Sequence, residues 1–164
     1  MLDLNGTSSL VTGGASGLGE AAARQLAARG AKVVIVDLND DKGVKVAGDI
    51  GGEYVRADVT DPEAVIAALT VAEGLGTFRT AVAAAGIGAA SRTIGRDGTY
   101  ESAFNLDYFT QVINVNLIGV FNTVRLAATA VSRTEPFDTD GQKGAIVTLA
   151  SIAAFDGQIG QAAY

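Results

Sequence analysis

The sequence contains no histidine and no cysteine among its 164 residues. Without them the chain cannot build a Ser-His-Asp triad, a thiol nucleophile, a disulfide framework or a zinc site of Cys and His ligands. We therefore expect no metal site. Acid and base chemistry has to come from Tyr, Lys, Asp or Glu.

Basic residues are also in the minority, with 12 Lys and Arg against 18 Asp and Glu and a net charge of −6. Nucleic-acid binding needs clustered Lys and Arg, so we expect no nucleic-acid partner. The N-terminus, MLDLNGTSSL, lacks the basic start and apolar run of a signal peptide. No stretch reaches the roughly 18 continuous apolar residues of a membrane span. These features predict a cytoplasmic protein with no membrane partner.

Segments of two kinds alternate along the chain. Apolar runs rich in Val, Ile and Ala predict buried strands at residues 9–12, 32–37, 54–58, 80–85 and 145–151. Helical patterns lie between them at residues 18–29, 41–50, 61–73 and 106–132. The alternation predicts an α/β fold with right-handed crossovers, which is a Rossmann-type doubly wound parallel sheet of about five strands. We interpret residues 1–164 as a single domain.

Two helices carry more specific signals. Thr60, Pro62 and Glu63 predict a capping box in which Thr60 is the N-cap of the third helix. The fourth helix is roughly 40 Å long at about 1.5 Å per residue. Its apolar residues are expected on one face, leaving surface for a partner subunit: Leu106, Phe109, Ile113, Leu117, Val120, Val124 and Val131.

A glycine-rich turn joins the first strand to the first helix. The stretch TGGASGLG places backbone N–H groups and the positive end of a helix where they can hold a pyrophosphate. We expect Gly13, Ser16, Gly17, Leu18 and Gly19 to contact a dinucleotide there. The plainer interpretation is a tight strand-to-helix connection without a ligand.

Asp37 stands at the end of the second predicted strand, roughly 20 residues after the glycine turn. An acidic side chain there can accept hydrogen bonds from the adenosine ribose hydroxyls and would repel a 2′-phosphate. No Lys or Arg follows before Lys42, so NAD is favoured over NADP. The alternative is that Asp37 only caps a turn.

With this glycine spacing the sequence resembles the short-chain dehydrogenase/reductase family. Further motifs follow in the family's order, namely Asp58-Val59, AAAG, NVN, and a serine shortly before a tyrosine. The resemblance implies hydride transfer by a tetrad of Asn, Ser, Tyr and Lys, of which Asn116, Ser151 and Tyr164 are present. It also implies cofactor contacts from Ala85 and Gly86 and adenine contacts from Asp58 and Val59.

Within that family the chain is similar to short-chain 3-hydroxyacyl-CoA dehydrogenases, a subgroup with hydroxysteroid-active relatives. The similarity rests on ASIAAFDGQIGQAAY, INVNLIGVFNTVRLAA and the insertion TEPFDTDGQKG. It implies an NAD-dependent oxidation of a 3-hydroxyacyl-CoA to a 3-oxoacyl-CoA, with acyl-CoA as the small-molecule substrate. A homodimer or homotetramer is implied as well.

The resemblance also implies a separate catalytic role for each residue of the tetrad. Tyrosine, with an ordinary pKa near 10, needs cationic neighbours to act as a base. Tyr164 would take the hydroxyl proton, Ser151 would bind the substrate oxygen, and Asn116 would hold a water of the proton relay. The family's lysine falls one helical turn after Tyr164, which is the last residue. We therefore expect an N-terminal portion of the enzyme, or alternatively a truncated NAD-binding or interaction module without turnover.

Overall fold

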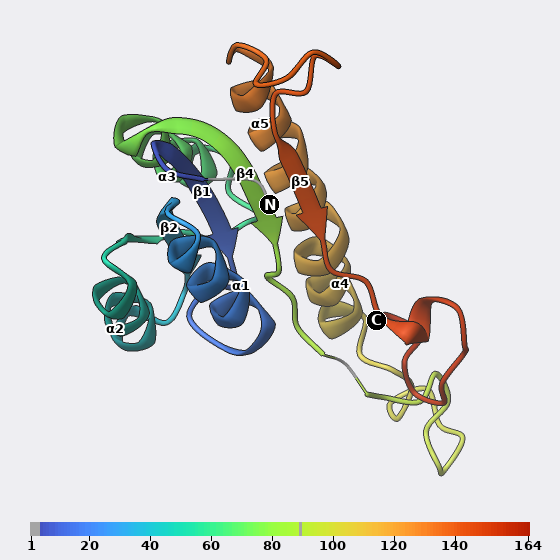
Figure 1. Ribbon diagram of the computed structural model, residues 1–164. Helices are drawn as coiled ribbons and strands as arrows, with labels where there is room; N and C mark the ends of the chain where they lie inside the picture. Colours follow the sequence, from blue (N-terminus) through green and yellow to red (C-terminus); the bar gives the residue numbers. More distant parts are fainter. Residues whose placement is uncertain (1–3, 89) are drawn as a thin grey trace.

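The centre of the protein is a five-stranded parallel sheet (Figure 1). The computed structural model describes residues 4–88 and 90–164. The strand order is β3-β2-β1-β4-β5, and every neighbouring pair is parallel. The strands are β1 (Thr7–Thr12), β2 (Lys32–Asp37), β3 (Glu53–Arg56), β4 (Thr77–Ala83) and β5 (Ala145–Thr148). This arrangement confirms the predicted Rossmann-type doubly wound α/β fold.

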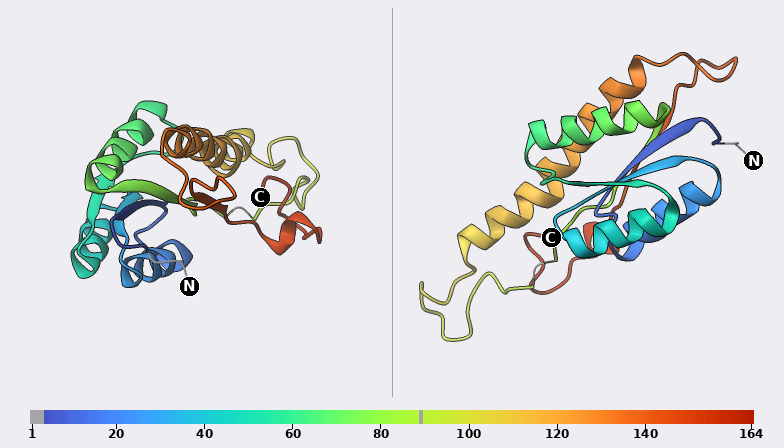
Figure 2. Two further views of the ribbon diagram at one scale, coloured as in Figure 1. Left: turned by 45° about the horizontal axis from the view of Figure 1, so that its top comes forward. Right: turned by 90° about the vertical axis from the view of Figure 1, so that its left-hand side faces the viewer.

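Helices cover both faces of the sheet, as Figure 2 shows. One face carries α1 (Gly17–Ala28) and α2 (Asp40–Ile50), and the other carries α3 (Pro62–Leu75) together with a long helix. Alternate residues of β2 pack against the helices on opposite faces of the sheet. Val33 and Ile35 belong to the apolar cluster with α1 and α2, whereas Val34 and Val36 belong to the cluster with α3 and the long helix. A strand buried on both faces is continuously apolar for this reason.

The long helix runs in three parts, α4 (Leu106–Ile113), a π-helix η1 (Asn114–Gly119) and α5 (Val120–Ser132). Its apolar face differs from the expected one, because Leu106 and Leu117 are exposed. The π-helix alters the phase of the side chains, and small residues let the helix lie close to the sheet. Its buried positions are Val112, Gly119, Asn122, Thr123, Ala127 and Ala130.

The start of α3 corrects a second expectation. Asp61, not Thr60, is the N-cap, and its carboxylate accepts hydrogen bonds from the N–H groups of Glu63 (2.9 Å) and Ala64 (3.3 Å). Pro62 then occupies the first helical position, where its missing N–H is not needed. Thr60 instead donates both its N–H and its hydroxyl hydrogen to Oδ1 of Asp58, which closes a turn. The predicted N-cap was therefore wrong by one residue, and Glu63 stands at the second helical position, where it does not complete a capping box.

The long helix, Leu106–Ser132, is long and apolar enough to cross a membrane by length and composition alone. Helices that pack on the sheet of an α/β domain pass the same test. Here the helix lies against α3, β4 and β5, so in this fold it forms part of one layer.

Candidate active site

A cavity of about 830 Å³ opens at the edge of the sheet where the strands end. Parallel α/β sheets bind ligands in this crevice, outside the carboxyl ends of the strands. Its walls come from the turn after β1, the end of β2, the loop after β4, the long helix and the segment after β5. It brings together eleven of the predicted site residues: Gly13, Ser16, Gly17, Leu18, Gly19, Asp37, Ala85, Gly86, Asn116, Ser151 and Tyr164.

The glycine turn is built so tightly that side chains are excluded. Gly13 has φ 66°, and a Cβ there would lie 2.8 Å from the backbone of Ala84 and Ala85. A Cβ at Gly19 would lie 2.2 Å from the Gly13 carbonyl oxygen. The backbone of the turn therefore borders the cavity directly, and the first turn of α1 begins beside it.

Asp37 faces the glycine turn from the end of β2. Its Oδ2 accepts a hydrogen bond from the Ala15 N–H (3.1 Å), and its Oδ1 accepts one from the Asn39 N–H (3.0 Å). The two bonds fix the carboxylate at the cavity wall. Each carboxylate oxygen can accept more than one hydrogen bond, so Asp37 can still accept bonds from a ligand's hydroxyl groups.

Asn116 lies within the π-helix and faces the loop after β4. Its Nδ2 donates to the Ile87 carbonyl (2.8 Å), and its Oδ1 accepts from the Ile87 N–H (2.8 Å). π-helical turns are frequent at functional sites, where they re-aim a side chain. Here the amide fixes the loop that forms one wall of the cavity.

Ser151 and Tyr164 complete the far wall. Ser151 is the N-cap of a short 3₁₀ turn, η2 (Ile152–Ala154), and its Oγ accepts a hydrogen bond from the Ala153 N–H (3.2 Å). Tyr164 lines the cavity with 46% of its surface exposed. Both residues therefore border the same cavity as the glycine turn and Asp37.

Asp58 and Val59 lie outside the described cavity lining. The Asp58 carboxylate accepts hydrogen bonds from the N–H (2.9 Å) and hydroxyl (2.8 Å) of Thr60. Val59 is buried, and its carbonyl accepts a hydrogen bond from Asn122. Their adenine contacts stay a prediction.

Sequence reasoning missed two glutamines of the wall, Gln158 and Gln161. The Oε1 of Gln161 is buried and accepts no hydrogen bond from the residues that the structure describes. The repeated GQ pairs before Tyr164 were the available signal. Residues 158–164 form turns and one isolated bridge, from Gln161 to Ser91.

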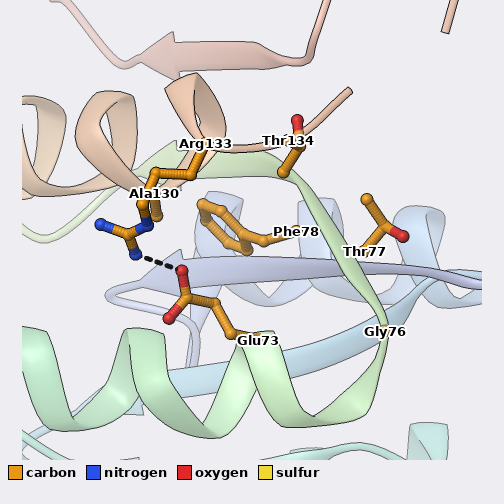
Figure 3. A pocket seen from close by; sticks show the side chains of 7 residues that line it. All are labelled: Glu73, Gly76, Thr77, Phe78, Ala130, Arg133 and Thr134. Carbon is orange, nitrogen blue, oxygen red and sulfur yellow. Dashed lines mark hydrogen bonds and ion pairs between the residues drawn. The ribbon is translucent and has the colours of Figure 1, made fainter. Parts of the chain in front are cut away.

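A smaller cavity, of about 410 Å³, lies at the other end of the sheet, beside the start of β4 (Figure 3). Arg133 and Glu73 form an ion pair with each other across it. Their charges are thus already paired, and the strands' carboxyl ends point away. The larger cavity is the better candidate for the active site.

The comparisons with known proteins agree with this geometry. The family model described as short chain dehydrogenase matches residues 8–164. The 3-hydroxyacyl-CoA dehydrogenase type-2 of Drosophila melanogaster is 47% identical over 159 residues, covering 95% of this chain and 61% of the relative. That of Bos taurus is 46% identical over 164 residues, covering 98% and 62%.

A crystal structure of 3-hydroxyacyl-CoA dehydrogenase type-2 from Mycobacterium avium superimposes with a TM-score of 0.91 at 42% identity. The match covers 99% of this chain and 63% of that one. The chain thus spans about three fifths of the length of these relatives. On the family match and these identities, the chain belongs to the short chain dehydrogenase family.

Proposed function

We propose that this chain is the cofactor-binding part of an NAD-dependent dehydrogenase that interconverts a secondary alcohol and a ketone. The proposed substrate pair is a 3-hydroxyacyl-CoA and a 3-oxoacyl-CoA, after the names of the similar proteins. One observation carries the proposal. A single cavity is lined by the glycine turn and Asp37 on one side and by Asn116, Ser151 and Tyr164 on the other.

The residues present fit a nicotinamide dinucleotide. A Cβ at Gly13 would collide with the loop after β4, so this turn keeps its backbone open to a pyrophosphate. Asp37 supplies acceptors for ribose hydroxyls and a negative charge that disfavours a 2′-phosphate. We therefore propose NAD over NADP. When bound, the cofactor accepts a hydride from the alcohol carbon.

Three residues of this chain then have separate roles in the reaction. Tyr164, as the phenolate, would take the proton of the substrate hydroxyl as the hydride leaves, and would return that proton to solvent after the reaction. The Ser151 hydroxyl already accepts a bond from Ala153, so its own hydrogen is free to donate to the substrate oxygen. Asn116 holds the Ile87 loop with its amide, and a relay water would bind its remaining lone pair or a nearby helix carbonyl.

The test is NADH formation at 340 nm from 3-hydroxybutyryl-CoA, measured with wild-type protein and with Tyr164→Phe. We expect the variant to lose about 10²-fold or more of its turnover and to bind NAD as before. Tyr100→Phe is the matched control, because Tyr100 is 97% exposed and lies away from the cavity. NAD binding by wild-type protein without any turnover would favour the alternative, a binding or interaction module.

A cytoplasmic location and an assembly of two or four chains belong to the same proposal. Support for assembly comes from apolar side chains on the long helix, where Leu117, Ile118 and Phe121 are each at least half exposed. Apolar patches of this kind often mark protein interfaces. Light scattering of wild-type protein and of Phe121→Asp tests it, since a monomer in both cases would contradict the assembly.

A further inference from the structure

The loop after β3, residues 57–61, is attached to the long helix through Val59. The Val59 side chain is 5% exposed and packs against Gly119, where a Cβ would lie 2.5 Å from its Cγ2. The Val59 carbonyl accepts a hydrogen bond of 2.8 Å from Nδ2 of Asn122, whose side chain is itself buried. Both the side chain and the backbone of Val59 are therefore fixed by the helix.

The orientation of the Asn122 amide is set by Arg125. Two guanidinium nitrogens of Arg125 donate to Oδ1 of Asn122, Nε at 3.0 Å and Nη2 at 2.6 Å. Charge-assisted bonds of this kind are the stronger ones. Since Oδ1 is held by a cation, Nδ2 has to face the Val59 carbonyl.

The same loop lies where the adenosine half of a dinucleotide would end. β3 pairs with β2 in a register that sets Arg56 beside Asp37, so the loop begins next to the ribose-binding carboxylate. The helix that holds it contributes Asn116 and Val120 to the cavity wall, on either side of Gly119. The loop is thus the next piece of backbone beyond Asp37 at the carboxyl edge of the sheet.

We propose that Asn122 is a positioning residue for the adenosine half of the cofactor, acting through Val59 without touching the ligand. The inference rests on the proposed dinucleotide function. A loop that is fixed before binding loses little conformational entropy when the ligand binds, and the smaller entropy loss gives a higher affinity. Asn122 is 4% exposed, so its contribution is made entirely inside the protein.

The test compares three ligands, NAD, AMP and nicotinamide mononucleotide, by NMR titration of wild-type protein and of Asn122→Asp. The aspartate keeps its size and its bonds to Arg125 but presents an oxygen to the Val59 carbonyl. We expect the Kd of NAD and of AMP to rise about tenfold, the size of one lost buried hydrogen bond. The Kd of nicotinamide mononucleotide should not change. Asn114→Asp, on the same helix but exposed, should change none of the three.

Gly119→Ala provides a second route to the same loop, because its new methyl group would push on Val59 while Asn122 stays intact. It should reproduce the selective loss of AMP and NAD affinity, with faster hydrogen exchange at the amides of residues 57–61. Equal weakening of all three ligands, or unchanged AMP affinity in folded variants, would overturn the inference alone. A wild-type chain that binds neither NAD nor AMP would overturn both the inference and the proposed function.

Discussion

Asn116 pairs with Ile87 as one strand pairs with another, because its amide donates to the Ile87 carbonyl and accepts from the Ile87 N–H, both at 2.8 Å. The loop that leaves β4 has no strand of its own to bond to at this point. A side chain of the long helix supplies the missing donor and acceptor. The Asn116 amide therefore holds this loop in the cavity wall, together with the Tyr108 hydroxyl, which donates to the Gly88 carbonyl (2.8 Å).

Replacing Asn116 by Leu should lower the free energy of unfolding by about 1–3 kcal/mol, since two polar backbone groups of Ile87 lose their partners. Urea denaturation measures the change. Asn114→Leu is the matched control, because Asn114 is exposed on the same π-helix, and it should stay within about 0.5 kcal/mol of wild type. Equal effects of the two substitutions would contradict the role given to the Ile87 contact.

Gly13→Ala should reduce both stability and NAD affinity. Its positive φ costs an alanine about 1–2 kcal/mol, and its Cβ would also lie 2.8 Å from Ala84 and Ala85. Gly51→Ala separates the two causes, because Gly51 has φ 63° with nothing within 4 Å of the added Cβ. Thermal denaturation and NAD titration should show only the conformational cost at Gly51. Normal NAD binding by Gly13→Ala would argue against a tight backbone approach.

Asp37→Asn should weaken NAD binding. It should also reduce the protein's preference for NAD over NADP, measured as the ratio of the two Kd values, about tenfold or more. Like charges about 4 Å apart repel by about 1 kcal/mol in water and more strongly beside protein, and the substitution removes one of them. An asparagine also loses at least one of the bonds from Ala15 and Asn39, because both of these groups are donors. The Kd values of both cofactors measure the effect, and Asp41→Asn, exposed at the start of α2, serves as the control. An unchanged ratio of the two Kd values would remove Asp37 from cofactor selection.

The Tyr54 hydroxyl should ionise at a higher pH than an ordinary tyrosine. Burial, with the hydrogen bond to Asp40 (2.7 Å) acting in the same direction, raises the pKa of Tyr54 to about 12. A tyrosine in the unfolded chain has a pKa of about 10, so the folded state holds its proton longer. The stabilisation is complete below pH of about 10 and is lost as the pH rises through the folded value of about 12.

Subtracting the ultraviolet titration of Tyr54→Phe from that of wild type isolates this one phenol among the chain's 4 tyrosines. The difference curve should have its midpoint near 12. The advantage of wild type over the variant in urea denaturation should shrink over the same range. A midpoint at the ordinary value would mean that Tyr54 is neither buried nor bonded to Asp40 in solution.

Much of the fold could be predicted because each signal was local. A run such as KVVIVD can be read as a buried strand without knowledge of its neighbours, and Asp37 could be placed at its end. The capping error at Thr60 shows the limit of such patterns. Thr60 and Asp61 are both good N-caps, and only the extended backbone of Asp61 (φ −95°, ψ 110°) decides between them.

The candidate site was less accessible to sequence reasoning because its supports are contacts between distant segments. Asn116 reaches Ile87, and Asn122 reaches Val59, across 29 and 63 positions of the chain. The π-helix leaves no pattern in the sequence that separates it from an ordinary helix. The predicted apolar face was therefore wrong at Leu117, which lies inside the π-helix and is exposed.

The π-helix at Asn114–Gly119 also bears on how the chain can change in length. A π-turn takes up more residues than an α-turn, so the flanking segments keep their faces as though a residue had been inserted between them. Removing one residue there should leave α5 seated on the sheet and move only Asn116. The same removal inside α5 would rotate every later side chain by about 100° and turn the buried alanines outward. We thus expect the helix to lose a residue at this place without unfolding, and this place is the one that aims Asn116 at the loop after β4.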